Sequence, residues 1–200
     1  MRKETKTLLI FALMPVLAAA AFMPRENQSV RPVPFEDSGW WLYQNEQQGF
    51  SFLLPPPLRI TITRTRPLDW SAENRMPFDY VNFLPYPQSS AFAPFELGVG
   101  VHWNRDLLAT REFADRKDDG LIKGGAQFEV IRRSDTLVCG IQGVCDDFRM
   151  RQTSGWRSYS RVIIPYQDKF FVFLATLGGD DPVAEHARVF EQILDSFTLQ

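Results

Sequence analysis

The segment at residues 49–57, GFSFLLPPP, fixes the first well-bounded strand of the chain. Gly49 tolerates a positive φ, so the polar run before it can turn into a strand at this point. Residues 50–54 are strand-like, and the three prolines that follow cannot donate hydrogen bonds to a neighbouring strand. We therefore predict a hairpin of strands 40–43 and 50–54 that opens the folded domain, with its turn at residues 45–49.

Strand-like patterns continue along the rest of the chain, separated by glycine, proline and other turn residues. The segment FFVFLAT (170–176) is apolar on both faces, which predicts a central strand covered on both sides. Further strands are expected at residues 58–65, 79–84, 95–103, 127–132, 136–139, 144–151 and 156–164.

Two segments have helical character. Residues 110–123 form one candidate, with Thr110 as the N-cap, and residues 182–197 form the other, with Asp181 as the N-cap and Pro182 in the first turn. Together with the strands, they predict an α+β fold, an αβα sandwich. Its central antiparallel sheet has about six or seven strands, with helices on both faces.

The N-terminus has the features of a secretory signal. Basic residues precede an apolar run that closes on small residues, so we expect residues 1–21 to be a signal peptide cleaved after Ala20 or Ala21. Residues 22–39 then form a flexible lead-in, and residues 40–200 form a single domain. The predicted location is periplasmic or secreted; the alternative is an uncleaved N-terminal anchor, which would be the sole membrane contact.

Composition and motifs point away from several classes of function. The 200 residues carry a net charge of −2, so no global field favours nucleic acid. Neither His102 nor His186 lies in a nucleophile or zinc motif. The carboxylate pairs lack calcium-loop spacing, and Asp118 and Asp119 are expected on a solvated helix end. We therefore predict that the chain is not an enzyme and holds no metal or cofactor.

The two cysteines, Cys139 and Cys145, are predicted to form a disulfide. An even cysteine count in an exported chain favours a bridge, and a five-residue loop would set the two residues opposite each other in a hairpin. The alternative is two buried thiols that act as small apolar side chains.

Two groups of residues are candidates for binding. The first is a proline-rich aromatic tract, which either contacts a partner or packs on the sheet as a flap: Trp70, Phe78, Tyr80, Phe83, Tyr86 and Phe92. The second is Arg149 and Arg151, which with Arg157 and Arg161 would lie on adjacent strands. A guanidinium beside Trp156 or Tyr159 would hold an anionic partner; the alternative is that the arginines are exposed and form ion pairs with Asp146 and Asp147.

The order of these segments resembles the PsbP-like family of exported proteins. The resemblance spans roughly residues 40–200 and rests on GFSFLLPPPL (49–58), TREFADR (110–116), CGIQGVCDDFRM (139–150), SRVIIPYQDKFFVFLAT (160–176) and FEQILDSF (190–197). The chain departs from the family at Leu58, where such proteins often carry tryptophan after the proline.

The family includes extrinsic lumenal subunits of photosystem II that support calcium and chloride retention, and bacterial exported proteins. What the resemblance implies is an αβα sandwich that serves as a non-enzymatic accessory protein and binds another envelope protein. It does not imply photosynthesis, and no family site residue is carried over. The alternative function is a small-molecule or lipid-binding envelope module that uses residues 67–94.

Overall fold

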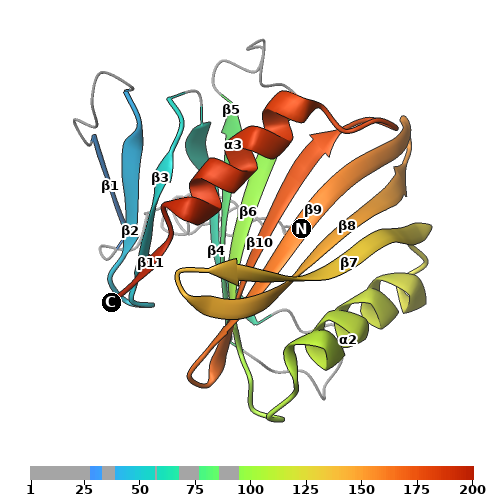
Figure 1. Cartoon of the computed structure of the whole chain (residues 1–200), viewed down its shortest axis with the longest axis horizontal. Coiled ribbons are helices and arrows are strands. Elements are labelled where there is room, and N and C mark those ends of the chain that lie inside the picture. Colours follow the sequence, from blue (N-terminus) through green and yellow to red (C-terminus); the bar gives the residue numbers. More distant parts are fainter. Residues whose placement is uncertain (1–27, 33–38, 57, 68–76, 86–94) are drawn as a thin grey trace, which may run out of the picture.

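The computed structural model describes residues 28–32, 39–56, 58–67, 77–85 and 95–200, which form two antiparallel sheets and two helices (Figure 1). In spatial order, the larger sheet consists of β4 (Leu58–Pro67), β5 (Pro77–Pro85), β6 (Glu96–Trp103), β10 (Lys169–Gly178), β9 (Gly155–Tyr166), β8 (Ile141–Gln152) and β7 (Phe128–Val138). The smaller sheet consists of β1 (Gln28–Pro32), β2 (Trp41–Asn45), β3 (Phe50–Leu54) and β11 (Thr198–Leu199). The predicted α+β class and the size of the main antiparallel sheet are confirmed.

The segment that opened the sequence analysis forms β3, with the predicted bounds. Its hairpin with β2 turns between Asn45 and Gly49, and Gly49 has a φ of +72°. The hairpin lies in the smaller sheet rather than the main one, because β3 pairs with β11 on its other side. Residues 28–32 form β1 against β2, so this part of the expected lead-in is a strand.

The central strand β10 presents aromatic side chains to both faces of the main sheet, as its apolar sequence predicted. Phe170 stacks on Phe113 of α2 (Thr110–Lys123), with ring centroids 4.2 Å apart. The next residue, Phe171, and Phe173 contact Phe197, just beyond α3 (Ala184–Asp195), at 5.7 and 5.1 Å. Because successive side chains of a strand point to opposite faces, Phe113 of α2 and Phe197 contact opposite faces of β10.

The face of β10 that contacts α3 holds the larger hydrophobic core. Phe50 and Phe52 of β3 pack edge-on against Phe171 and Phe173, with centroid distances of 5.4 and 5.5 Å. The smaller sheet and α3 therefore share one side of the main sheet. Burying each of these side chains favours folding by about 1.5–3 kcal/mol, so the short β3 contributes strongly to this core.

Both helices begin differently from the prediction. The N-cap of α2 is Ala109 and that of α3 is Val183, and neither makes a side-chain capping hydrogen bond. Thr110 is instead the first helical residue, and Asp181 and Pro182 precede the cap of α3. Packing of the apolar faces therefore determines these helices more than capping does.

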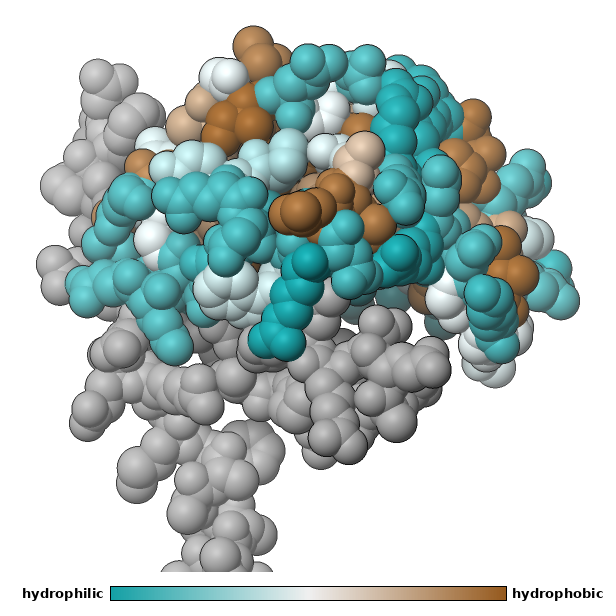
Figure 2. Space-filling view, turned by 90° about the horizontal axis from the view of Figure 1, so that it is seen from below, coloured by the Kyte–Doolittle hydropathy of each residue, from teal (hydrophilic) through white to brown (hydrophobic). Residues whose placement is uncertain are grey.

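Within the described residues, neither helix is long and apolar enough to span a bilayer. Seen from below, the described surface is mostly hydrophilic, with hydrophobic residues in small separate groups (Figure 2).

Candidate functional site

Most of the predicted aromatic tract cannot be placed in a binding surface. Trp70, Tyr86 and Phe92 lie outside the described residues. Phe78 and Tyr80 lie on β5, which pairs with β4 and β6 inside the main sheet. The tract therefore remains a prediction at five of its six positions.

The sixth aromatic residue of the tract, Phe83, belongs to the core. Its side chain is fully buried, and its ring packs edge-on against Tyr43 and Phe52 at centroid distances of 5.2 and 5.7 Å. A partner at the surface has no access to this ring, so Phe83 is a core residue of the main sheet rather than part of a contact surface.

The arginine pair at residues 149 and 151 does form a compact site, which we call the arginine–tryptophan cluster (Arg149, Arg151 and Trp156). The β8–β9 hairpin pairs Arg151 with Trp156, so the three side chains share one face of the sheet. The guanidinium carbons of Arg149 and Arg151 lie 4.9 and 5.8 Å from the centre of the Trp156 ring. Both distances are within the range of a cation–π interaction.

The surroundings of this cluster hold it in place on both sides. Glu129 on β7 forms an ion pair with Arg149 at 2.7 Å. Ser158, which pairs with Arg149 across the ladder, donates its hydroxyl to the carbonyl oxygen of Gly179 at 2.8 Å. Within the described part of the chain, Arg151 forms no ion pair, and its side chain is exposed. The cluster thus has one guanidinium available to an anion on a fixed aromatic support.

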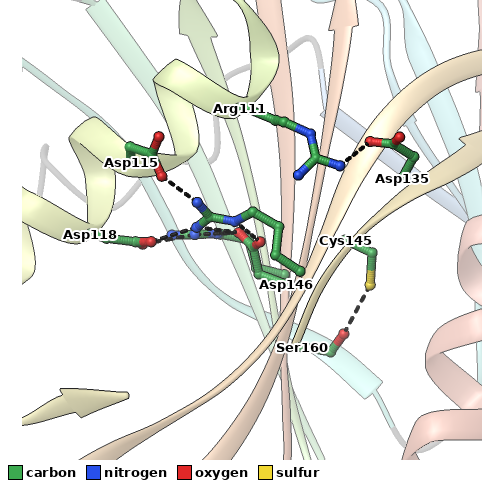
Figure 3. A network of polar contacts seen from close by, with 9 residues as sticks. Arg111, Asp115, Asp118, Asp135, Cys145, Asp146 and Ser160 are labelled. Atoms are coloured by element: carbon green, nitrogen blue, oxygen red, sulfur yellow. Dashed lines mark hydrogen bonds and ion pairs between the residues drawn. The ribbon is translucent and has the colours of Figure 1, made fainter. Parts of the chain in front are cut away.

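A second polar site lies between α2 and the sheet, and we call it the buried ionic ring (Asp118, Asp146, Arg133 and Arg161). Arg161 contacts Asp118 at 2.8 Å and Asp146 at 3.0 Å, and Arg133 contacts Asp118 at 2.5 Å and also pairs with Asp146 (Figure 3). Each arginine therefore bridges the same two aspartates. The side chain of Asp146 is 0% exposed and that of Arg161 is 6% exposed.

The charges of this ring compensate one another. Burial alone would lower the pKa of Arg133, but hydrogen bonds from its guanidinium to Asp146 and Asp118 outweigh that effect and raise the pKa. Asp118 was expected on a solvated helix end; that prediction is wrong, because its side chain reaches inward to both arginines. Arg161 does pair with Asp146, but inside the molecule, whereas the predicted alternative was exposed arginines paired with Asp146 and Asp147.

Beside the ring lies a pair of basic side chains. The Nζ of Lys117 on α2 is 3.2 Å from the Nδ1 of His102 on β6. Burial, with repulsion from Arg161, lowers the pKa of Lys117 to about 8. Burial and the charge of Lys117 also lower the pKa of His102 well below its usual value. His102 is therefore neutral at pH 7. The other histidine, His186, is buried on α3, 3.1 Å from the carbonyl oxygen of Leu177.

The predicted disulfide is not formed. Cys139 and Gly140 are themselves the two-residue turn between β7 and β8, with φ values of +52° and +75°. Cys145 pairs instead with Ser134 across the ladder. Both thiols are free: Cys139 is exposed, and Cys145 lies 3.8 Å from the hydroxyl of Ser160 (Figure 3). A positive φ in both turn residues is typical of a tight hairpin, which sets the cysteines too far apart along the strand to bridge.

The comparisons with known proteins show the fold. A search of protein-family models found no match, and a search of curated protein sequences found none either. The solution structure of cyanobacterial PsbP (CyanoP) from Synechocystis sp. PCC 6803 is similar to this chain with a TM-score of 0.60 and 15% identity, covering 84% of this chain and 96% of that one. The chain therefore has a PsbP-like fold.

Two further solved structures are less similar. One is a protein of unknown function from Pseudomonas aeruginosa, with a TM-score of 0.46 and 13% identity over 80% of this chain and 97% of that one. The other is LpqN of Mycobacterium tuberculosis, described as involved in cell envelope biogenesis, with a TM-score of 0.37 and 15% identity over 90% of this chain and 87% of that one.

Proposed function

We propose that this protein is an exported, non-enzymatic accessory protein that binds another protein of the cell envelope. We further propose that the arginine–tryptophan cluster is part of the contact surface. The observation that carries the proposal is the position of Trp156, half-buried beneath two guanidinium groups at one end of the β8–β9 hairpin. The resemblance to a family of exported accessory proteins and the apolar, basic N-terminal segment support the location.

The composition of the cluster suits protein recognition. Tryptophan and arginine are the residue types most enriched among the energetically dominant residues of protein interfaces. The ion pair with Glu129 holds Arg149, and the pairing of β8 with β9 holds Trp156 beside it before a partner arrives. This reduces the conformational entropy lost on binding. Arg151 can then donate to a carboxylate of the partner, because its guanidinium forms no ion pair within the described residues.

Site-specific photocrosslinking in the native host tests this proposal. A photoreactive residue at Thr153, in the turn beside the cluster, should give a discrete adduct with one envelope protein. The same residue at Gln192, exposed on α3, is the matched control and should not give that adduct. Trp156→Ala and Arg151→Glu should each abolish the adduct at position 153 while leaving the circular dichroism spectrum unchanged.

Binding to the purified partner then completes the test. Trp156→Ala should raise the dissociation constant by about tenfold or more, the size expected for a dominant interface residue. An adduct at position 153 that persists in both variants would remove the cluster from the contact surface. Export is tested by fractionating the cells and sequencing the N-terminus of the protein from each fraction. Recovery of the protein in the cytosolic fraction alone, still beginning at Met1, would contradict export.

A further inference from the structure

Helix α2 rests on the main sheet through a narrow apolar contact. The buried apolar residues of α2 are Phe113 and Ala114, and they pack with Ile163 and Phe170 of the sheet. The other helix, α3, buries four apolar side chains: Val189, Phe190, Ile193 and Leu194. Elements with few buried apolar contacts open locally at a lower cost in free energy than well-packed ones. Of the two helices, α2 is therefore the one that a change in charge releases more easily.

His102 on β6 lies against the side chains by which α2 meets the sheet. Its ring approaches the ring of Phe113 edge-on, with 5.4 Å between the centroids. Its Nδ1 lies 3.2 Å from the Nζ of Lys117, which is one helical turn beyond Phe113. The Nζ of Lys117 in turn lies 5.2 Å from the centre of the Phe113 ring. One imidazole therefore contacts both an apolar and a charged side chain of α2.

The contact between His102 and Lys117 depends on the protonation state of the imidazole. An ammonium group has donors and no acceptor, so a neutral His102 accepts from Lys117 at Nδ1 and carries its own proton on Nε2. A protonated imidazole donates at both nitrogens. Its Nδ1–H would then face the donors of Lys117 across 3.2 Å, and two positive charges would meet at two half-buried side chains. Protonation of His102 thus replaces a hydrogen bond with a repulsion.

Apolar residues are the neighbours of His102 in the ladder on both sides. Phe170 of β10 and Phe78 of β5 lie opposite His102. The charged residues one position along these strands, Lys169 and Asp79, belong to the other face, because successive residues of a strand alternate. The ladder positions opposite His102 therefore hold no group that would compensate a charged imidazole.

The other charges near this contact come from α2, the loop before it and the buried ionic ring. Arg161 of the ring repels Lys117, and Lys117 repels a charged His102. Burial acts in the same direction, so the pKa of His102 lies well below its usual value. Both ring aspartates are already bridged by both ring arginines. In the loop, Asp106 pairs with Arg116. The charges around His102 thus oppose its protonation while α2 is docked.

We propose that His102 is a proton switch for α2: when its imidazole binds a proton, α2 opens from the main sheet and uncovers Phe170 and Ile163, which are fully buried when α2 is docked. In the open state the imidazole meets water and has its usual pKa of about 6.5. Because the docked state disfavours the proton, docking is fully favourable above about pH 6.5 and weakens as the pH falls below that value. Between pH 7.5 and 5.0 the equilibrium constant for opening should rise by about fivefold to 30-fold.

Hydrogen exchange of the purified protein, corrected for intrinsic exchange rates, measures this opening at pH 7.5 and 5.0. Both pH values lie above the usual carboxylate pKa of about 4, so the ionic ring keeps its charges. The protection of residues 110–123 should fall by about fivefold to 30-fold at pH 5.0, while that of residues 184–195 stays unchanged. In His102→Gln the side-chain oxygen still accepts from Lys117 and does not titrate, so the protection of α2 should be equal at the two pH values.

An NMR titration of the His102 imidazole tests the switch without a change at His102. Its midpoint should lie below about pH 6.5, and Lys117→Met, which removes the facing charge, should raise the midpoint and reduce the loss of α2 protection. Lys123→Met, at the exposed end of α2, is the matched control and should change neither. The proposal is overturned by a midpoint at or above pH 6.5, by α2 protection that does not fall at pH 5.0, by an equal fall in both helices, or by a fall that persists in His102→Gln.

Discussion

The buried ionic ring leads to a quantitative prediction for Asp146→Asn. Asp146 has a fully buried side chain that accepts from Arg161 and Arg133. At an effective dielectric of about 20, each ion pair near 4 Å is worth about 4 kcal/mol, and part of this offsets the cost of burying the charges. Removing one partner of a buried pair typically costs about 3–5 kcal/mol. We expect a loss of that size in the free energy of unfolding.

Urea unfolding followed by circular dichroism measures this loss, with the slope of the transition unchanged. The matched control is Asp106→Asn, since Asp106 pairs with Arg116 at 2.5 Å but both side chains are about half exposed. That exposed pair should contribute about 0–1 kcal/mol. Equal losses for the two variants would refute the idea that burial makes the ring energetically important.

The paired variant Asp146→Leu with Arg161→Met sharpens the reasoning. It removes one charge of each sign and leaves Arg133 with Asp118, so the remaining site is still balanced. Replacing a complete buried ion pair with apolar side chains is often neutral or stabilising. The double variant should therefore be more stable than Asp146→Asn alone, and the opposite order would show that packing, not charge balance, dominates here.

Three further predictions follow from single positions. Gly143→Ala should lower the unfolding free energy by about 1–3 kcal/mol in a thermal or urea melt, because the new Cβ would lie 2.5 Å from a carbonyl oxygen of β9; Gly120→Ala, with open space in α2, should raise it by about 0.5–1 kcal/mol. The pKa of Lys117 is about 8 in the folded chain against a usual 10.5, so between these pH values the unfolded chain binds more protons and the free energy of unfolding rises with pH. In Lys117→Met this rise should be smaller, and urea midpoints at pH 7.5 and 10 measure it. Cys139 should react with maleimide in the folded protein, and a reducing agent should leave the melting temperature unchanged, because neither it nor Cys145 is bridged.

The strands were predictable because their signal is local. Turn residues located β3 at its observed bounds, and capping signals placed α2 at residues 110–123, with only its N-cap wrong by one residue. The division into two sheets was not predictable in the same way, because it depends on β3 pairing with residues near position 198, which no local pattern encodes. The predicted turn between the two cysteines was wrong for another reason. Cys139 adopts a positive φ that glycine or asparagine usually provides, whereas the prediction took the glycines at 140 and 143 as the turn and placed it too late in the chain.

Of the two polar sites, one was predictable from the sequence and the other was not. The sequence predicted a guanidinium beside Trp156 or Tyr159, because a hairpin aligns neighbouring strands at short range; the structure places Arg149 and Arg151 over Trp156. The buried ionic ring was missed, since Asp118 and Arg161 are 43 residues apart and meet only when α2 packs on the sheet. The available signal was an arginine inside the apolar run that forms β9, a position where a charge needs a buried partner.

The pairing of β3 with β11 also sets an order on the assembly of the chain. β3 is synthesised early, yet its outer ladder is closed only by residues 198–200, through Thr198 opposite Ser51 and a bond from Gln200 N–H to the Gly49 carbonyl oxygen at 2.8 Å. While those residues are still on the ribosome, the smaller sheet has an exposed strand edge with phenylalanines beside it. A chain that crosses a membrane unfolded would expose this edge after translocation instead. In either case residues 198–200 complete the pairing of β3.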